Sequence, residues 1–133
     1  MNNNEKVREL CQKWLDEQDA KKHRRDMLKA LPVAIEYFEQ KIIKARSVFA
    51  DRAFDLRKIK LEIWDLLDDE DFERINSNQN LPVNFPYTTA LEADKHFYNS
   101  LVNAYNKAFA YLVECEEQLI ELKEQLEALK NEN

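Results

Sequence analysis

The stretch Thr89–Lys130, TALEADKHFYNSLVNAYNKAFAYLVECEEQLIELKEQLEALK, decides the fold of this chain. It contains neither proline nor glycine, and most of its apolar residues alternate at spacings of three and four. That spacing predicts a helix over residues 89–130 with one apolar edge packed against another helix. The edge consists of Leu91, Tyr98, Leu101, Tyr105, Ala108, Leu112, Cys115, Leu119, Leu122, Leu126 and Leu129.

A second helix is predicted over residues 32–67, because Pro32 suits the first turn of a helix and no breaker follows it. Its main apolar edge has the same spacing, so we expect the two helices to pair as a long antiparallel hairpin. A further apolar stripe lies off that edge and needs a cover of its own. This outer stripe, our candidate protein interface, consists of Ile43, Ala50, Phe54, Leu61 and Trp64.

Ahead of Pro32, residues 4–31 are predicted to form a first helix that Asn3 or Asn4 can cap. From Asp16 to Asp26 its apolar pattern lapses, so the helix could break near residues 16–20. Before that lapse it has one apolar face, made of Val7, Leu10, Cys11, Trp14 and Leu15.

The junction at Leu31–Pro32 leaves two arrangements open. If the chain reverses there, the first helix covers the outer stripe and the protein is a monomeric three-helix bundle. If Pro32 only kinks a continuous helix, the outer stripe is bare and serves as an interface. The junction has no Gly, Asn, Asp or Ser for a tight reversal, which favours the second arrangement. We therefore expect a protein partner or self-association, most simply a two-fold dimer.

Between the long helices, a run of aspartates can cap a short helical turn over residues 69–75. A loop over residues 76–88 follows, because its prolines and asparagines oppose a helix. We expect Thr89 and Glu92 to start the long helix as a capping box. The apolar loop residues expected to cover one end of the bundle are Leu81, Val83, Phe85 and Tyr87.

The predicted fold is thus a single all-α domain over residues 1–133. It is an elongated helical bundle of about three main helices, built on the long antiparallel hairpin. Its C-terminal segment resembles a coiled coil, because from Cys115 onward the apolar face narrows to one edge.

The composition excludes several classes of protein. Of the 133 residues, 44% are hydrophobic and 35% charged, which is neither a disordered nor a membrane-spanning chain. The start MNNNEKVREL lacks the pattern of a signal peptide, and no apolar run approaches the ~18 residues of a membrane helix. Cys11 and Cys115 lie in helical apolar patterns, so we expect buried free thiols and a cytoplasmic location.

The search for reactive chemistry finds little. Glycine is absent, which removes the phosphate-cradling loops of nucleotide enzymes. Glu92 and His96 lie one turn apart, but the repeated Glu-x-x-His pattern of helical di-iron sites is missing. No nucleophile has an identifiable base and orienting acid. We therefore expect no enzyme activity, no metal, no cofactor and no small-molecule substrate.

Charge is distributed unevenly along the chain. Residues 1–67 hold 15 basic and 12 acidic side chains, whereas residues 68–133 hold 5 and 14. Either the two halves neutralise each other when packed, or they present faces of opposite sign to partners. The candidate phosphate-binding residues are Lys21, Lys22, Arg24 and Arg25, and the candidate acidic partner face is Glu114, Glu117, Glu121 and Glu124.

Three functions follow from these features. The favoured one is a non-enzymatic protein-interaction module, either an assembly subunit or a small inhibitor, which acts through its helical faces. The acidic face could instead imitate a phosphate backbone and inhibit a nucleic-acid-binding protein. The basic run could instead serve a small subunit of a nucleoprotein complex, although nucleic acid is not the favoured partner.

Overall fold

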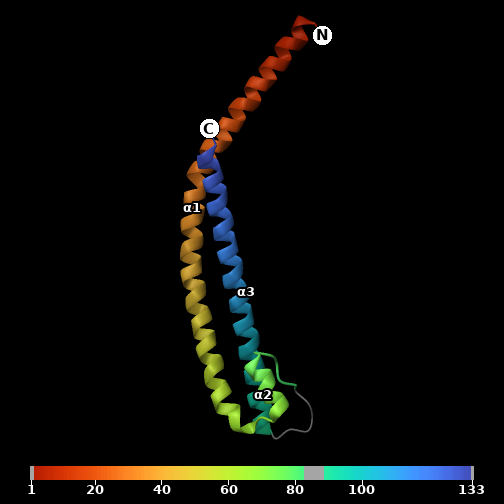
Figure 1. Cartoon of the computed structure of the whole chain (residues 1–133), viewed down its shortest axis with the longest axis vertical. Coiled ribbons are helices and arrows are strands. Elements are labelled where there is room, and N and C mark those ends of the chain that lie inside the picture. Colours follow the sequence, from red (N-terminus) through yellow and green to blue (C-terminus); the bar gives the residue numbers. More distant parts are fainter. Residues whose placement is uncertain (1, 83–88, 133) are drawn as a thin grey trace. The chain divides into compact units, whose positions relative to one another are not determined.

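The computed structural model describes residues 2–82 and 89–132, and of residues 89–92 it describes the backbone alone. This described part is helical throughout its regular structure and contains no strand. It consists of α1 (Asn3–Ile63), a short 3-10 helix η1 (Trp64–Leu66), α2 (Asp69–Asn76) and α3 (Thr89–Asn131) (Figure 1). The all-α prediction is confirmed, and so is the packing of the C-terminal helix against another long helix. The roles expected for Val83, Phe85, Tyr87 and the Thr89–Glu92 box lie outside the described residues.

α1 runs without a break through Pro32. The helices predicted over residues 4–31 and 32–67 are therefore one helix, which neither breaks near residues 16–20 nor reverses at Pro32. A proline inside a helix costs about 3 kcal/mol, because it removes a hydrogen bond and crowds the preceding turn. Apolar packing on both sides offsets this cost, since Leu31 is buried and Ile35 half-buried.

Asparagine and aspartate side chains fix the helix ends in this glycine-free chain. Asn2, rather than Asn3 or Asn4, caps α1, because its Oδ1 accepts a hydrogen bond from the Glu5 N–H at 2.9 Å. Asp68 caps α2 in the same way, with its Oδ1 2.8 Å from the Asp71 nitrogen. α2 ends where Asn78 adopts the left-handed conformation, at φ 53°. The Gln79 N–H then donates to the Arg74 carbonyl and the Asn78 N–H to the Ile75 carbonyl, the pattern of a Schellman cap.

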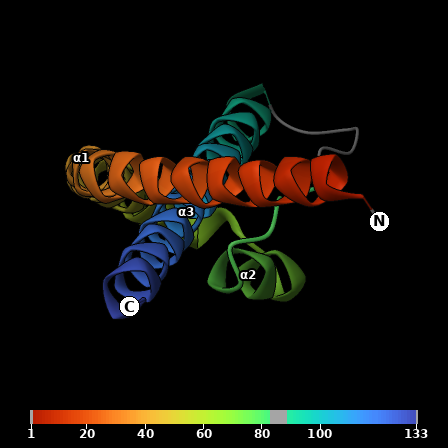
Figure 2. The same cartoon turned by 90° about the horizontal axis from the view of Figure 1, so that it is seen from above.

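The chain forms two compact units. Unit 1 comprises Met1–Glu39 and Glu117–Asn133, and unit 2 comprises Gln40–Glu116. In unit 2, α1 and α3 are antiparallel neighbours. The Phe49 ring lies between those of Tyr105 and Phe109, at centroid distances of 5.1 and 5.7 Å. Figure 2 shows α2 beside this helix pair and in line with neither long helix.

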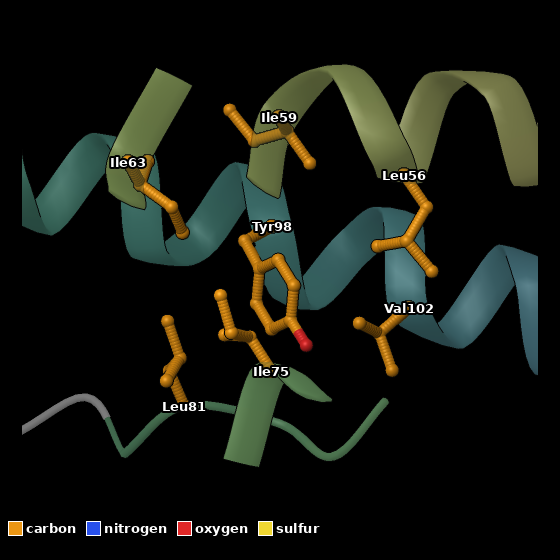
Figure 3. Close-up of a cluster of buried hydrophobic side chains, with 7 residues drawn as sticks. All are labelled: Leu56, Ile59, Ile63, Ile75, Leu81, Tyr98 and Val102. Carbon is orange, nitrogen blue, oxygen red and sulfur yellow. The ribbon is translucent and has the colours of Figure 1, made fainter. Parts of the chain in front are cut away.

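The main core of unit 2 lies where α1, α2 and α3 meet. Figure 3 shows the Tyr98 side chain reaching from α3 toward Ile75 of α2, with Ile59 and Ile63 of α1 on the other side. Leu81 closes the cluster from the segment after α2, as the loop interpretation predicted for this residue. The buried members are Leu56, Ile59, Ile63, Ile75, Leu81, Tyr98 and Val102.

Buried polar groups fix α2 and the segment that follows it. Asp71 and Lys95 are both buried and form an ion pair at 3.5 Å, and Arg74 also binds Asp71 at 3.0 Å. The Asn99 side chain binds the backbone of Leu81 twice. Its Oδ1 accepts from the Leu81 N–H at 2.6 Å, and its Nδ2 donates to the Leu81 carbonyl at 2.7 Å. These contacts satisfy backbone groups that no helix or strand would pair.

Unit 1 is a two-helix pair. Leu31 of α1 is its buried residue, and Glu39 lies 3.9 Å from Lys123 of α3. The edge residues of α3 in this unit are all half-buried, as expected where one helix covers another along a single edge. They are Leu119, Leu122, Leu126 and Leu129.

We predict that Asn99→Ala destabilises the protein by about 2–4 kcal/mol, because it leaves a buried N–H and carbonyl of Leu81 without partners. Denaturant unfolding monitored by circular dichroism measures this loss. Asn103→Ala is the matched control, since Asn103 is an exposed residue of the same helix and its loss should cost less than about 0.5 kcal/mol. Equal effects of the two changes would contradict the role of Asn99.

The stability of unit 2 should fall in alkali because of Tyr98. Burial raises the pKa of Tyr98 to about 12 from an ordinary value of 10.0, since the phenolate would lose its hydration. The folded chain thus keeps a proton that the unfolded chain releases, so this contribution to stability is complete below pH 10 and is lost as the pH rises toward 12.

Tyr98→Phe should remove that part of the pH dependence. At neutral pH the variant should lose about 1 kcal/mol with its hydrogen bond to the Gln79 carbonyl. Urea midpoints of both proteins, measured across the alkaline range, test this. Parallel pH profiles would show that Tyr98 does not carry the effect.

Candidate protein interface

The outer stripe predicted on α1 is exposed to solvent at every position in the structure. Phe54 is 69% and Leu61 67% exposed, although both are large apolar side chains. Ile43 and Ala50 are exposed as well. The spacing of seven from 43 to 50 and from 54 to 61 keeps these residues on one side of the helix. The opposite edge of α1, with Leu56 and Ile59, is buried against α3 and α2.

Trp64, the last member of the predicted stripe, has a neighbour from its own chain. It lies in η1, and its ring meets the Phe72 ring of α2 edge-on at a centroid distance of 4.3 Å. Part of its surface is therefore occupied by α2. The exposed stripe on α1 itself consists of Ile43, Ala50, Phe54 and Leu61.

A second exposed apolar face lies on the first turns of α1, which we name the N-terminal arm (residues 3–22). Leu10 is 68% and Trp14 59% exposed, and Val7 and Leu15 are also exposed. Figure 1 shows the arm, in red and orange, beyond the C-terminal end of α3. The expectation of two buried free thiols holds for Cys115 only, because Cys11 is exposed on this face.

The sequence did not reveal a groove between α1 and α3 on one side of unit 2, which we name the side groove. It consists of three hollows of about 560, 220 and 370 Å³. The first two share Val48 and Ala108, and the third continues along the same side of α1 with Asp55 and Glu62. Val48, Asp55 and Glu62 are spaced by seven, which places them on one side of the helix. The sequence signal that could have predicted this groove is the group of alanines around Lys107, namely Ala104, Ala108 and Ala110. It is a weak signal.

The basic run does not present four free cations. The Arg24 Nη2 donates to the carbonyls of Leu129 and Glu132, each at 3.0 Å, and its Nε lies 3.8 Å from the Glu132 carboxylate. Arg24 therefore caps the C-terminus of α3, whose last carbonyls lack helical partners and carry partial negative charge. The other three candidates are exposed, namely Lys21, Lys22 and Arg25.

The candidate acidic face is exposed along α3, at Glu114, Glu117, Glu121 and Glu124. None of the four forms an ion pair with a described residue in the structure. The neighbouring Glu116 does, with Arg46 of α1 at 3.3 Å. Exposed carboxylates one turn apart repel each other, so the row adds charge to the surface without stabilising the helix.

The structure also bears on metals and membranes. Among residues 2–82 and 89–132, no group of three or more His, Cys, Asp and Glu side chains is arranged to hold a metal ion. Glu92, paired with His96 in the sequence argument, has a side chain outside the described part. None of the described helices combines the length and the apolar character needed to cross a membrane.

We predict that Arg24→Gln destabilises the protein more than Arg25→Gln does, because Arg24 binds the end of α3 whereas Arg25 is exposed. Arg24→Gln should cost about 1 kcal/mol, because it removes hydrogen bonds to the end of α3. It should also speed amide hydrogen exchange over the last turn of α3. Arg25→Gln is the matched control and should change stability by less than about 0.5 kcal/mol. Equal exchange rates in both variants would contradict the capping role.

Comparison with known proteins identifies no relative: no protein-family model, no curated protein and no solved structure matches this chain.

Proposed function

We propose that this protein is a non-enzymatic interaction module that binds another protein through the outer stripe of α1. The observation that carries the proposal is the exposure of Phe54 and Leu61, at 69% and 67%, on one side of a helix whose opposite edge is buried. Large apolar side chains gathered on one exposed face of a soluble domain mark an interaction site. A partner helix or a flat apolar surface would suit a straight stripe of this kind.

The energetic argument concerns desolvation. Each large apolar side chain contributes about 1.5–3 kcal/mol when it is fully buried. Phe54, Leu61 and Ile43 together supply enough apolar surface for the centre of an interface, while the charged residues beside them would form its rim. The same surface could be occupied by a second copy of the chain, in which case the protein is an assembly subunit.

The two alternatives rest on charge alone. The acidic row and the three free cations of the basic run are exposed, which is equally the state of any solvated helix face. We rank them below the outer stripe for that reason.

The two free cysteines suit a reducing compartment, and we place the protein inside the cell on this ground.

We predict that Phe54→Asp combined with Leu61→Asp weakens partner binding at least ~100-fold, because apolar anchors at the centre of an interface contribute about 2 kcal/mol or more each. Stability should change by less than about 1 kcal/mol, since both positions are exposed. Binding is measured by titration against the partner purified with the full chain, and self-association by light scattering.

Ile120→Asp is the matched control, because Ile120 is an exposed apolar residue of α3 outside the stripe. It should leave binding unchanged. If the double variant binds as tightly as the unmodified chain, the outer stripe is not the interface. If Ile120→Asp alone abolishes binding, the interface lies on α3.

A further inference from the structure

We propose that the N-terminal arm binds the surface of an anionic lipid bilayer, with its helix axis parallel to that surface. This function is separate from protein binding by the outer stripe, because the arm belongs to unit 1 and the stripe to unit 2. Such a contact involves the lipid headgroups and the outermost acyl carbons, so it needs no membrane-spanning helix. Two features of the arm carry the proposal, namely its broad apolar face and the distribution of charge around that face.

The apolar face of the arm is broad and uncovered. Five of the nine residues from Val7 to Leu15 are apolar, whereas the seam between two paired helices takes about two of every seven. At 3.6 residues per turn, Leu10 and Leu15 lie at the two edges of the face, about 140° apart around the helix. A face of this width suits a flat surface better than the edge of one other helix. Trp14 lies between the two edges and is 59% exposed, and tryptophan favours the headgroup level of a bilayer.

Basic side chains lie on the apolar side of the arm and along both of its edges. Lys21 follows Trp14 by seven residues, or two turns, which places it on the same side of the helix. Lys22 and Arg25 lie on that side as well, and the other three flank the face, about 20–60° beyond its edges. None of the six forms an ion pair with a described residue. The six exposed basic residues are Lys6, Arg8, Lys13, Lys21, Lys22 and Arg25.

Acidic side chains are concentrated on the opposite side of the arm. Glu5, Glu9 and Asp16 are spaced by four and seven residues, so they form one line along the helix. This line lies about 150–170° around the helix from the middle of the apolar face. Before the half-buried Met27, the remaining acidic residues lie just beyond the edges of the face, and they are Glu17, Asp19 and Asp26.

The two sides of residues 3–26 therefore differ in charge. The apolar side and its edges carry six basic and three acidic side chains, and the opposite side carries three acidic side chains and no lysine or arginine. Arg24 stands apart from this count, because its guanidinium binds the end of α3. A helix with its side chains is about 10 Å across, and physiological salt screens charges over about 8 Å. The acidic line is thus screened from a surface that the apolar face touches.

This arrangement matches the chemistry of an anionic bilayer. A bilayer presents negative headgroups along both edges of an embedded apolar face, and the arm has cations at both edges. Lysine and arginine side chains lay their apolar stems on the acyl boundary while their charged ends reach the headgroups. The exposed residues of the basic run, which Arg24 leaves unused for capping, extend the same contact by one more turn at Lys21, Lys22 and Arg25.

Vesicle flotation with the full chain tests the proposal. The chain should bind phosphatidylcholine vesicles that contain about one third phosphatidylserine, and should bind vesicles of phosphatidylcholine alone at least ~tenfold more weakly, because the cations then lack anionic headgroups. Added salt should weaken the binding, since exposed charges are screened. Equal binding to both kinds of vesicle, or no binding to either at about 1 mM lipid, would overturn the proposal.

An arm variant and a stripe variant locate the contact. Leu10→Asp with Trp14→Asp should weaken binding to the anionic vesicles at least ~tenfold, because two apolar anchors are replaced by anions. Phe54→Asp with Leu61→Asp is the matched control, since it places the same charges on the outer stripe, and it should bind as the unmodified chain does. Circular dichroism checks that each variant keeps its helices. An arm variant with unchanged binding, or a stripe variant that loses it, would overturn the proposal.

Two pairs of neutral substitutions test the orientation of the arm without altering its apolar face. Glu17→Gln with Asp19→Asn removes two anions at the edges and should tighten binding at least ~fivefold. Glu9→Gln with Asp16→Asn removes two anions from the far side and should change binding less than ~twofold. Equal effects of the two pairs would contradict the orientation and with it the proposal.

Tryptophan emission gives an independent readout. In a Trp64→Phe background Trp14 is the only tryptophan, and its emission should shift to shorter wavelength when the anionic vesicles are added. Emission that stays unchanged on vesicles that bind the chain would show that Trp14 does not enter the bilayer. A protein is the competing occupant of the arm. A chain that binds no vesicles, yet forms dimers in light scattering that Leu10→Asp with Trp14→Asp splits, would overturn the lipid contact in favour of a protein one.

Discussion

Burial of one apolar edge of α1 against α3 is the interaction on which the rest of this structure depends. In unit 2 the edge is buried at Ile42, Ala45 and Leu56, and in unit 1 at Leu31. Two paired helices cover only one edge of each other, because each presents a cylinder with side chains all round. Every apolar residue off that edge must therefore find a cover elsewhere or stay in water. α2 and the segment after it provide such a cover around Tyr98 and Ile75, and the remaining apolar faces are left exposed.

Polar contacts decide where the covering elements lie. The buried Asp71–Lys95 pair and the Asn99 contacts to Leu81 hold α2 and the following segment against α3. A buried ion pair adds little net stability, because desolvation of both charges offsets their attraction. We infer that its consequence is specificity, since the contact between Asp71 and Lys95 forms only when α2 lies at this position beside α3. Across the long helices, pairs such as Arg46–Glu116 join the basic half of the chain to the acidic half, so packing accounts for part of the charge asymmetry.

The exposed faces share a physical origin. α1 has more apolar surface than α3 and α2 cover, on the outer stripe and again on the arm. The side groove lies between α1 and α3, and no third helix of the described residues covers it. Apolar surface in water and an open groove are both unfavourable states that association with another helix relieves. The binding function that we propose rests on these uncovered apolar faces.

The sequence by itself determined the helices and their apolar edges. Spacings of three and four, the absence of glycine and the aspartates before α2 predicted nearly all of the secondary structure, because periodicity and capping are local properties. The candidate outer stripe could also be predicted from the sequence, since helical phase alone separates it from the buried edge.

The sequence could not predict what covers each apolar face, because the spacing of apolar residues is the same whether the face packs against the same chain, packs against another chain or stays in water. Pro32 was compatible with a reversal or a continuous helix, and only the packing of Leu31 and Ile35 on both sides of it decided for α1 as one helix. Tertiary structure likewise decided the capping role of Arg24 and the exposure of Cys11. The end of α3 lies beside Arg24, whereas Cys11 lies beyond that end and is exposed. The side groove, finally, exists only in the folded pair, because the α1 and α3 residues that form its walls are about 35 to 70 positions apart in the sequence.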